Sequence, residues 1–255
     1  MKKGLYLENK VVAITGAASG IGKEIALLFE QHGAKIALLD CDKEKLGELS
    51  EQHPENMKSF CVDITDEQDV VSTFKMIEDT LGVPDVLVNN AGIFTAGIIT
   101  ETDYEVWKKI LDVNLNGAFL CAKYAIAAML RAGKSGNVIN IASEAGIAAI
   151  YGQVAYNVSK AAMISLSQCM AVDYAKHNIR VNCVCPGRVH TPLVQHIIDN
   201  SPNPAETLHK LSSDRPVMRM GNPRDIAYAC LHFADDSMPY ATGAVLSVDG
   251  GYTAR

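Results

Sequence analysis

A tyrosine and a lysine four residues apart, Tyr156 and Lys160, form the pair with the clearest chemical potential in this sequence. On a helix, residues four apart lie on one face, about one turn from each other. A free phenol has a pKa near ~10, and a close positive charge favours the phenolate and lowers that pKa. The pair is therefore suited to moving a proton near neutral pH. Taken alone it is a weak signal, because the same spacing occurs by chance on many solvated helix faces.

The elements that must position this pair alternate between short apolar runs and longer amphipathic stretches. Predicted strands cover residues 10–15, 35–39, 57–62, 86–89, 137–141, 180–185 and 244–248. Predicted helices cover residues 22–32, 42–52, 67–81, 104–131, 154–176 and 223–233. Several strands are unbroken runs of Val, Ile and Leu, as in a parallel sheet covered on both faces. The alternation predicts an α/β fold of Rossmann type, a doubly wound parallel sheet of about seven strands with helices on both faces.

The chain shows no linker, no internal repeat and no break in composition, so we predict a single domain over residues 1–255. Residues 189–219 are the least regular part, with several prolines between helix-like patches. Long segments of this kind are often lids or binding loops. We therefore expect residues 189–219 to form a substrate lid within the domain. The predicted helix 104–131 also changes character at Asn114.

Composition excludes several classes of partner. The net charge of −6 gives no electrostatic support for a nucleic-acid partner. The apolar stretches are shorter than the ~20 residues of a membrane span, and no signal peptide is recognisable. The 7 cysteines are scattered through apolar segments without the spacing of a zinc site. We expect a cytoplasmic protein with reduced thiols, no metal, and neither a membrane nor a nucleic-acid partner.

Glycines between the first predicted strand and helix indicate a phosphate-binding turn. Residues 15–22 read TGAASGIG, and such glycines let the backbone approach a pyrophosphate at the N-terminus of the helix. Asp40 ends the second strand, where a carboxylate accepts hydrogen bonds from ribose hydroxyls and repels a 2′-phosphate. The nearest cation is Lys43, which lies beyond a second acid, Asp42. These residues favour NAD over NADP, while Asp63 at the end of the third strand is placed to meet the adenine.

Together these motifs resemble those of the short-chain dehydrogenase/reductase family, in the family's order and spacing. The likeness extends through the terminal residues 249–252, and residues 170–187 are similar to the same stretch of bacterial dihydroanticapsin dehydrogenases. The matching motifs are 15–22, Asn89-Asn90-Ala91-Gly92, Asn114, Ser143, Tyr156 with Lys160, and 186–192. The resemblance therefore covers almost the whole chain.

The resemblance implies a role for each matching residue. Ser143 would bind the substrate oxygen, and Tyr156 would be the general acid or base. Lys160 would lower the pKa of that tyrosine and hold the nicotinamide ribose, while Asn114 would anchor a water linked to Lys160. Thr191 would hold the nicotinamide carboxamide. The expected cofactor-binding residues are Gly16, Ser19, Gly20, Ile21, Gly22, Asp40, Cys41, Asp63, Ile64, Asn90, Ala91, Gly92, Tyr156, Lys160, Pro186, Gly187, Val189 and Thr191.

The substrate is the part that the sequence defines least. Arg188 and His190 flank the position where the chain enters the predicted lid, and either could pair with a carboxylate, sulfonate or phosphate. An arginine bound to the lid or to a neighbouring subunit is the alternative. Ser143, Glu144 and Gln153 complete the expected substrate contacts, although Glu144 and Gln153 are equally compatible with surface roles.

The expected function is an oxidoreductase that transfers a hydride between NAD and a secondary alcohol or ketone. Its substrate would be a polyol, a sugar derivative, or a small cyclic or anionic hydroxy compound. An NADPH-dependent 3-oxoacyl reductase is the alternative within enzymes, and Asp40 argues against it. A catalytically silent nucleotide-binding protein is the remaining alternative, against which the complete set of Asn114, Ser143, Tyr156 and Lys160 argues. The resemblance also implies a homotetramer, with the long helices and the last strand at its interfaces.

Overall fold

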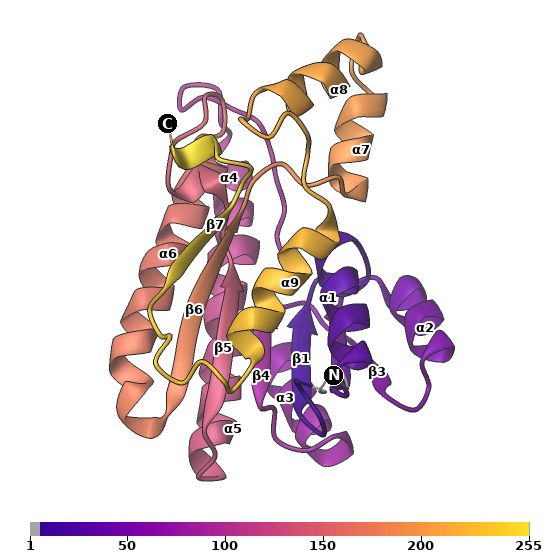
Figure 1. Ribbon diagram of the computed structural model, residues 1–255, viewed down its shortest axis with the longest axis vertical. Coiled ribbons are helices and arrows are strands. Elements are labelled where there is room, and N and C mark those ends of the chain that lie inside the picture. Colours follow the sequence, from indigo (N-terminus) through magenta and orange to yellow (C-terminus); the bar gives the residue numbers. More distant parts are fainter. Residues whose placement is uncertain (1–5, 255) are drawn as a thin grey trace.

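Parallel strands form the central sheet, with the strand order β3-β2-β1-β4-β5-β6-β7 (Figure 1). The computed structural model describes residues 6–254, so residues 1–5 and 255 of the predicted domain lie outside it. Every neighbouring pair in the sheet is parallel. The strands are β1 (Val11–Thr15), β2 (Lys35–Asp40), β3 (Met57–Cys61), β4 (Val86–Asn89), β5 (Gly136–Ile141), β6 (Ile179–Pro186) and β7 (Val245–Val248). The predicted Rossmann-type sheet in a single domain is confirmed.

Helices cover both faces of the sheet because successive side chains of each buried strand point to opposite faces. Val12 and Ile14 of β1 belong to one apolar cluster, whereas Val11 and Ala13 belong to the other. The first cluster includes α1 (Gly20–Gln31), α2 (Lys43–Gln52) and α9 (Pro223–Ala234). The second includes α3 (Glu67–Thr80), α5 (Gly117–Arg131) and α6 (Val154–Tyr174). The fold therefore has three layers, with its core on both sides of the sheet.

The predicted helix over residues 104–131 is continuous but contains a change of geometry at the expected residue. It consists of α4 (Tyr104–Leu111), a π-helical turn (Asp112–Asn116) and α5. Asn114 lies in the π-helical turn with its side chain fully buried. By length and hydropathy this stretch could span a membrane, but half of the apolar window is buried inside the fold. A core helix of a globular domain accounts for both properties.

Residues 189–219 contain two helices that the sequence suggested only as patches. These are α7 (Pro192–Asp199) and α8 (Pro204–Ser213), which stand above the sheet at the end where α1 begins (Figure 1). A proline at the start of each helix is compatible with its unpaired first turn. The loop after β6 leads directly into α7, so this helix pair lies over the carboxyl ends of the strands.

Candidate active site

Two adjoining cavities lie at the carboxyl ends of the strands, where parallel α/β sheets bind their ligands. They share part of their lining, including Ile21, Asn90 and Thr191. One, the nucleotide cavity, is lined by twelve of the expected cofactor residues: Gly16, Ser19, Gly20, Ile21, Asp40, Cys41, Asp63, Ile64, Asn90, Ala91, Gly92 and Thr191. The other, the catalytic cavity, is lined by Ser143, Glu144, Gln153, Tyr156, Lys160, Pro186, Gly187, Arg188 and Val189 among others.

The glycine turn between β1 and α1 is held in shape by its neighbour strand. Gly16 has a φ of +66°, a conformation that favours glycine. The side-chain amide of Asn90, after β4, donates to the backbone oxygens of Thr15 and Gly16 at 3.0 and 3.1 Å. Gly22 lines neither cavity, because it packs against the turn, where a Cβ would collide with the Gly16 oxygen. Gly22 therefore shapes the turn from behind.

The N-terminus of α1 opens into the nucleotide cavity. Ser19 is its N-cap residue, and the hydroxyl makes no capping hydrogen bond. The first backbone amides of a helix lack partners within the helix and carry the positive end of its dipole. The start of α7 comes close to the same point, since a Cβ on Gly20 would lie 3.5 Å from the methyl group of Thr191. The glycine turn, the N-terminus of α1 and the start of α7 thus meet at one place.

Asp40 is held at the far end of the nucleotide cavity. One carboxylate oxygen accepts from the amide of Ala18 and the other from the amide of Asp42, each at 3.1 Å. These bonds fix the orientation of the carboxylate. The carboxylate of Asp63, which also lines this cavity, accepts from the amide and hydroxyl of Thr65, and these bonds lower its pKa. Both carboxylates therefore sit at defined positions in the cavity.

Lys160 is buried behind the catalytic cavity with its ammonium group fixed. The side chain is 3% exposed, and Nζ donates to the backbone oxygen of Ile141 at 2.9 Å. Burial lowers the pKa of Lys160 to about 8, so at pH 7 the ammonium form still predominates. Gly92 leaves space beside it, since a Cβ there would lie 3.4 Å from Nζ and 3.3 Å from Oδ1 of Asn114.

Asn114 makes two hydrogen bonds to the backbone of Ile93, which lines both cavities. Its Oδ1 accepts from the amide of Ile93, and its Nδ2 donates to the Ile93 oxygen. The same Nδ2 donates to the hydroxyl of Ser159, the residue before Lys160, at 3.1 Å. The side chain therefore joins the π-helical turn, the segment after β4 and α6. The expected link from Asn114 to Lys160 through water stays a prediction.

Tyr156 and Ser143 both line the catalytic cavity. The ammonium of Lys160 lies 5.8 Å from the Tyr156 ring centroid, and the Phe94 ring meets the tyrosine edge at 5.3 Å between centroids. Burial raises the pKa of Tyr156, and a hydrogen bond with the Ser143 side chain counters that rise. The expectation that Lys160 lowers the pKa of this phenol stays a prediction.

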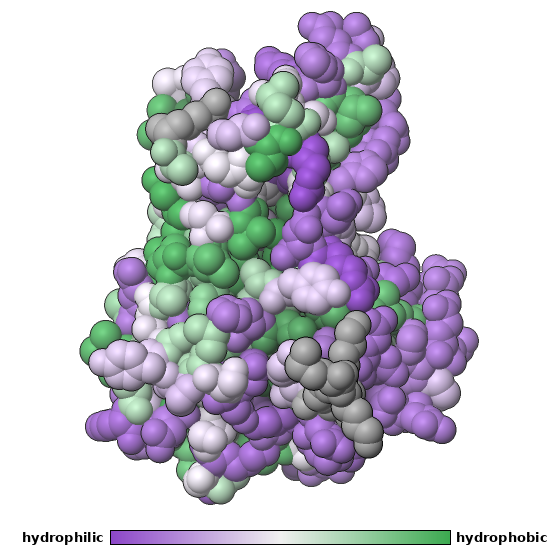
Figure 2. Space-filling model, in the orientation of Figure 1, coloured by the Kyte–Doolittle hydropathy of each residue, from purple (hydrophilic) through white to green (hydrophobic). Residues whose placement is uncertain are grey.

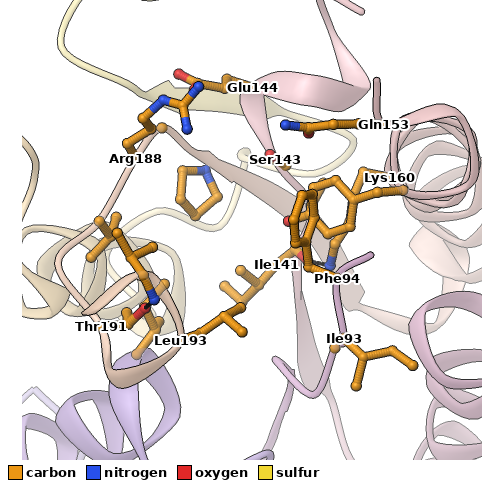
Figure 3. A pocket seen from close by; sticks show the side chains of 18 of the residues that line it. Ile93, Phe94, Ile141, Ser143, Glu144, Gln153, Lys160, Arg188, Thr191 and Leu193 are labelled. Atoms are coloured by element: carbon orange, nitrogen blue, oxygen red, sulfur yellow. Dashed lines mark hydrogen bonds between the residues drawn. The ribbon is translucent and has the colours of Figure 1, made fainter. Parts of the chain in front are cut away.

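A chain of alternating charges closes one end of the catalytic cavity. Nε of Arg188 donates to Asp214 at 3.0 Å, and Asp214 also pairs with Arg215 at 2.9 Å. Arg215 in turn pairs with Glu144 at 3.2 Å, and both side chains are at most 3% exposed. Burial raises the pKa of Glu144 while Arg215 counters it. Figure 3 shows Arg188 and Glu144 together at this end of the cavity.

Glycine at position 187 allows this buried ion pair to form against the backbone. A Cβ at Gly187 would lie 2.7 Å from both Arg215 Nη1 and Glu144 Oε2. Arg215 also donates to the backbone oxygen of Asp249 and lies 5.5 Å from the centroid of the Tyr252 ring. The segment after β7 therefore helps to hold Arg215 against Glu144, the residue that follows Ser143.

The sequence identified neither the ion pairs beside the catalytic cavity nor all of the cavity lining. Arg215 and Asp214 carried no signal, because their partners are distant in the chain and the surrounding segment lacks clear periodicity. The apolar wall was also missed, although helix-like patches were recognised there: it is formed by Ile93, Phe94, Ile141, Ile150, Leu193, Val194 and Ile197. His190 does not line the cavity; its exposed side chain bonds Gln195 at 2.7 Å.

Comparisons with known proteins agree with this geometry. Residues 16–253 match the family described as Enoyl-(Acyl carrier protein) reductase. The chain is 41% identical to an uncharacterized oxidoreductase of Thermotoga maritima, over 98% of this chain and 100% of the relative. It is 38% identical to 2-(S)-hydroxypropyl-CoM dehydrogenase 3 of Xanthobacter autotrophicus, over 97% of this chain and 98% of that protein. The finer likeness of residues 170–187 to dihydroanticapsin dehydrogenases stays a prediction.

Among solved structures, the aldohexose dehydrogenase of Thermoplasma acidophilum superimposes with a TM-score of 0.89 at 33% identity. The likeness covers 98% of this chain and 96% of that one. Sequence and fold therefore point to the same group of proteins. The chain belongs to the short-chain dehydrogenase/reductase family, whose members are oxidoreductases that act on CH–OH groups with a nicotinamide cofactor.

Proposed function

We propose that this protein transfers a hydride between NAD and a secondary alcohol or ketone, with Tyr156 as general acid or base. The observation that carries the proposal is the placement of Tyr156, Ser143 and Lys160 in a cavity that adjoins the nucleotide cavity. A phenol, a hydroxyl and an ammonium at this junction match the needs of proton transfer beside a dinucleotide.

The residues of the nucleotide cavity fit a dinucleotide. Gly16 and Gly20 both adopt positive φ angles at the start of α1, so the turn presents backbone amides without side chains. Its N-terminal amides and the unbonded Ser19 hydroxyl would hold the phosphates. Asp40 would accept the adenosine ribose hydroxyls, and Thr191 would hold the carboxamide. A bound nicotinamide supplies the hydride acceptor or donor.

The protein's own groups perform the proton chemistry. In the oxidising direction, the phenolate of Tyr156 takes the hydroxyl proton of the substrate, which Ser143 positions through its own hydroxyl. In the reducing direction, the phenol of Tyr156 returns that proton to the carbonyl oxygen. Lys160 holds a positive charge beside the tyrosine ring and would bind the nicotinamide ribose. The helices of residues 189–219 act as the lid that excludes water from this step.

The choice of NAD is testable at Asp40. A panel of secondary alcohols assayed with NAD and NADP, by absorbance of the reduced nicotinamide, should show higher kcat/KM with NAD. Replacing Asp40 with alanine removes the acceptor of both ribose hydroxyls. It should lower kcat/KM for NAD by about 10- to 100-fold, because hydrogen bonds to charged groups are among the stronger ones.

The matched control is Asp42→Ala, which removes a neighbouring carboxylate that caps α2 and binds Lys45. That variant should keep the wild-type preference, since Asp42 does not line the nucleotide cavity. Higher activity with NADP than with NAD in the unmodified protein would refute the role given to Asp40. It would favour an NADPH-dependent 3-oxoacyl reductase, which the acyl-carrier description of the matching family keeps as the second candidate.

We also propose that the protein is a cytoplasmic homotetramer. Figure 2 shows apolar surface gathered on the side of the molecule formed by α6, β6 and β7. Val158 and Val172 of α6 are 43% and 79% exposed, and Val245 of β7 is 36% exposed. Exposed apolar residues on neighbouring elements are typical of self-association surfaces. Light scattering should give four times the chain mass, and a monomer would reject the assembly.

A further inference from the structure

Arg188 presents an unbonded edge of its guanidinium group within the catalytic cavity. Its Nε atom donates to Asp214 at 3.0 Å, but Nη1 and Nη2 make no hydrogen bond to any residue from 6 to 254. The side chain is 30% exposed and lines the cavity together with Ser143 and Tyr156. The two terminal nitrogens are therefore available to a ligand in this cavity.

The position of this arginine is fixed by the charges behind it. Asp214 uses one oxygen for Arg188 and the other for Arg215, and Arg215 is anchored by the buried Glu144. The two carboxylates and two guanidinium groups alternate, so their charges balance. Arg188 is the member of this chain that is most open to the cavity. A ligand that binds there meets a cation that is already oriented, which reduces the entropy cost of binding.

The surroundings favour an ionic contact at this point. The cavity wall opposite the charged end consists mainly of Ile, Leu, Val and Phe side chains, which exclude water from a bound substrate. Glu144 already pairs with Arg215 and is only 3% exposed, so it competes only weakly with a substrate anion for the guanidinium group of Arg188. Lys160 is buried and bonded to Ile141. Arg188 is therefore the cation best placed to meet a charged substrate group.

We propose that Arg188 binds an oxyanion group of the substrate, so that the preferred substrates are secondary alcohols that carry a carboxylate or sulfonate. The planar guanidinium group matches such an oxyanion through two parallel hydrogen bonds from Nη1 and Nη2. Asp214 holds the opposite side of the same arginine. This inference rests on the proposed dehydrogenase function, and it adds the chemical class of the substrate.

The test compares matched charged and neutral alcohols. Racemic 3-hydroxybutyrate, 4-hydroxypentanoate and 5-hydroxyhexanoate are each assayed with NAD and compared with their methyl esters. The sulfonate 2-hydroxypropane-1-sulfonate is compared with the neutral alcohol 2-butanol. A panel of neutral polyols and cyclic alcohols is assayed in the same way. The unmodified protein should prefer the best anion over its neutral partner by about 10- to 100-fold in kcat/KM. Comparing the carboxylates with the sulfonate identifies which oxyanion is preferred.

Three variants assign the preference to Arg188. Arg188→Gln should abolish the preference for the anion, because kcat/KM falls by about 10- to 100-fold more on the anions than on the neutral alcohols. Arg188→Lys should restore part of the preference, since lysine keeps the charge without the planar pair of donors. Arg219→Gln is the matched control, because Arg219 is 58% exposed on its side chain, pairs with Asp225 and does not line the cavity. That variant should behave like the unmodified protein.

The outcomes separate this inference from the proposed function. Equal activity on anions and esters, faster oxidation of the neutral alcohols, or an equal loss on both in Arg188→Gln would overturn the oxyanion contact and leave the dehydrogenase intact. If only polyols or cyclic alcohols are oxidised, the contact is likewise overturned. Failure to reduce either NAD or NADP with any alcohol in the panel would instead refute the proposed function itself.

Discussion

Replacing Tyr156 with phenylalanine should lower kcat by about 10²- to 10⁴-fold, the usual contribution of a positioned acid or base. The substitution removes one hydroxyl and keeps the ring, so the edge contact with Phe94 is preserved. The nucleotide cavity does not include Tyr156 in its lining. Binding of NADH, measured by fluorescence, and the urea midpoint of unfolding should therefore remain close to those of the unmodified protein.

The control for this prediction is a second tyrosine nearby. Tyr151 is 90% exposed and lies outside both cavities, so Tyr151→Phe should leave kcat unchanged. A Tyr156→Phe variant that retains more than about a tenth of the activity would contradict the assigned role, because a general acid or base contributes more than that.

The pH dependence of the reaction rate tests the same role of Tyr156. Burial raises the pKa of Tyr156 and lowers that of Lys160 to about 8, so the phenol and ammonium forms predominate at pH 7. Oxidation needs the phenolate, so its rate should rise with pH, whereas reduction needs the phenol and should fall. Lys160→Met removes a positive charge that favours the phenolate, and should move the rising limb for oxidation to higher pH. A rate of oxidation that is flat across the neutral and alkaline range would oppose this mechanism.

Replacing Arg215 with methionine should lower the free energy of unfolding by about 3–5 kcal/mol, the usual cost of breaking a buried ion pair on one side. The side chain is 1% exposed and its removal leaves Glu144 as a buried, uncompensated carboxylate. It also removes the donor to the Asp249 oxygen and the contact with Tyr252. Urea unfolding of the variant measures the loss.

The acid dependence of this loss identifies Glu144 as its cause. Without Arg215, burial holds the pKa of Glu144 further above its ordinary value, so the folded state favours the protonated form. A group with a raised pKa in the folded state destabilises that state as pH rises above the unfolded value. The deficit of Arg215→Met should therefore shrink in acid, where Glu144 is neutral in both states.

A double variant separates charge from packing. Glu144→Gln combined with Arg215→Met replaces both charges, and it should recover most of the lost stability, because neutral replacements of a buried pair are often nearly neutral in energy. Arg219→Met, on the exposed arginine nearby, should change the free energy of unfolding by less than about 0.5 kcal/mol. A double variant as unstable as Arg215→Met alone would show that the contacts with Asp249 and Tyr252, not the charge, were lost.

The strands and the helix faces could be predicted from the sequence because their signal is local. Unbroken apolar runs marked β1 and β4, and the composition change at Asn114 marked the π-helical turn. Short motifs at strand ends identified residues that line the nucleotide cavity for the same reason, since the carboxyl ends of parallel strands must share one edge.

The buried ion pair between Glu144 and Arg215 could not be predicted, because it depends on a contact between distant segments. Glu144 and Arg215 are 71 positions apart in the chain, and nothing in either local sequence indicates burial. The burial of Tyr156 could not be predicted for a related reason: the spacing to Lys160 was visible in the sequence, but the depth of the side chain was not. Depth within a fold is a tertiary property that spacing along one helix does not carry.

The reversal of strand order between β1 and β4 has a consequence for how this protein can change. Asp40, which lines the nucleotide cavity, ends a strand on one side of the reversal, whereas Arg188, which lines the catalytic cavity, follows a strand on the other side. Asp40 bonds the amides of Ala18 and Asp42 whereas Arg188 bonds Asp214, so substitutions of Asp40 and Arg188 should combine additively. An evolving lineage could therefore acquire a new substrate by altering Arg188 while Asp40 stayed unchanged.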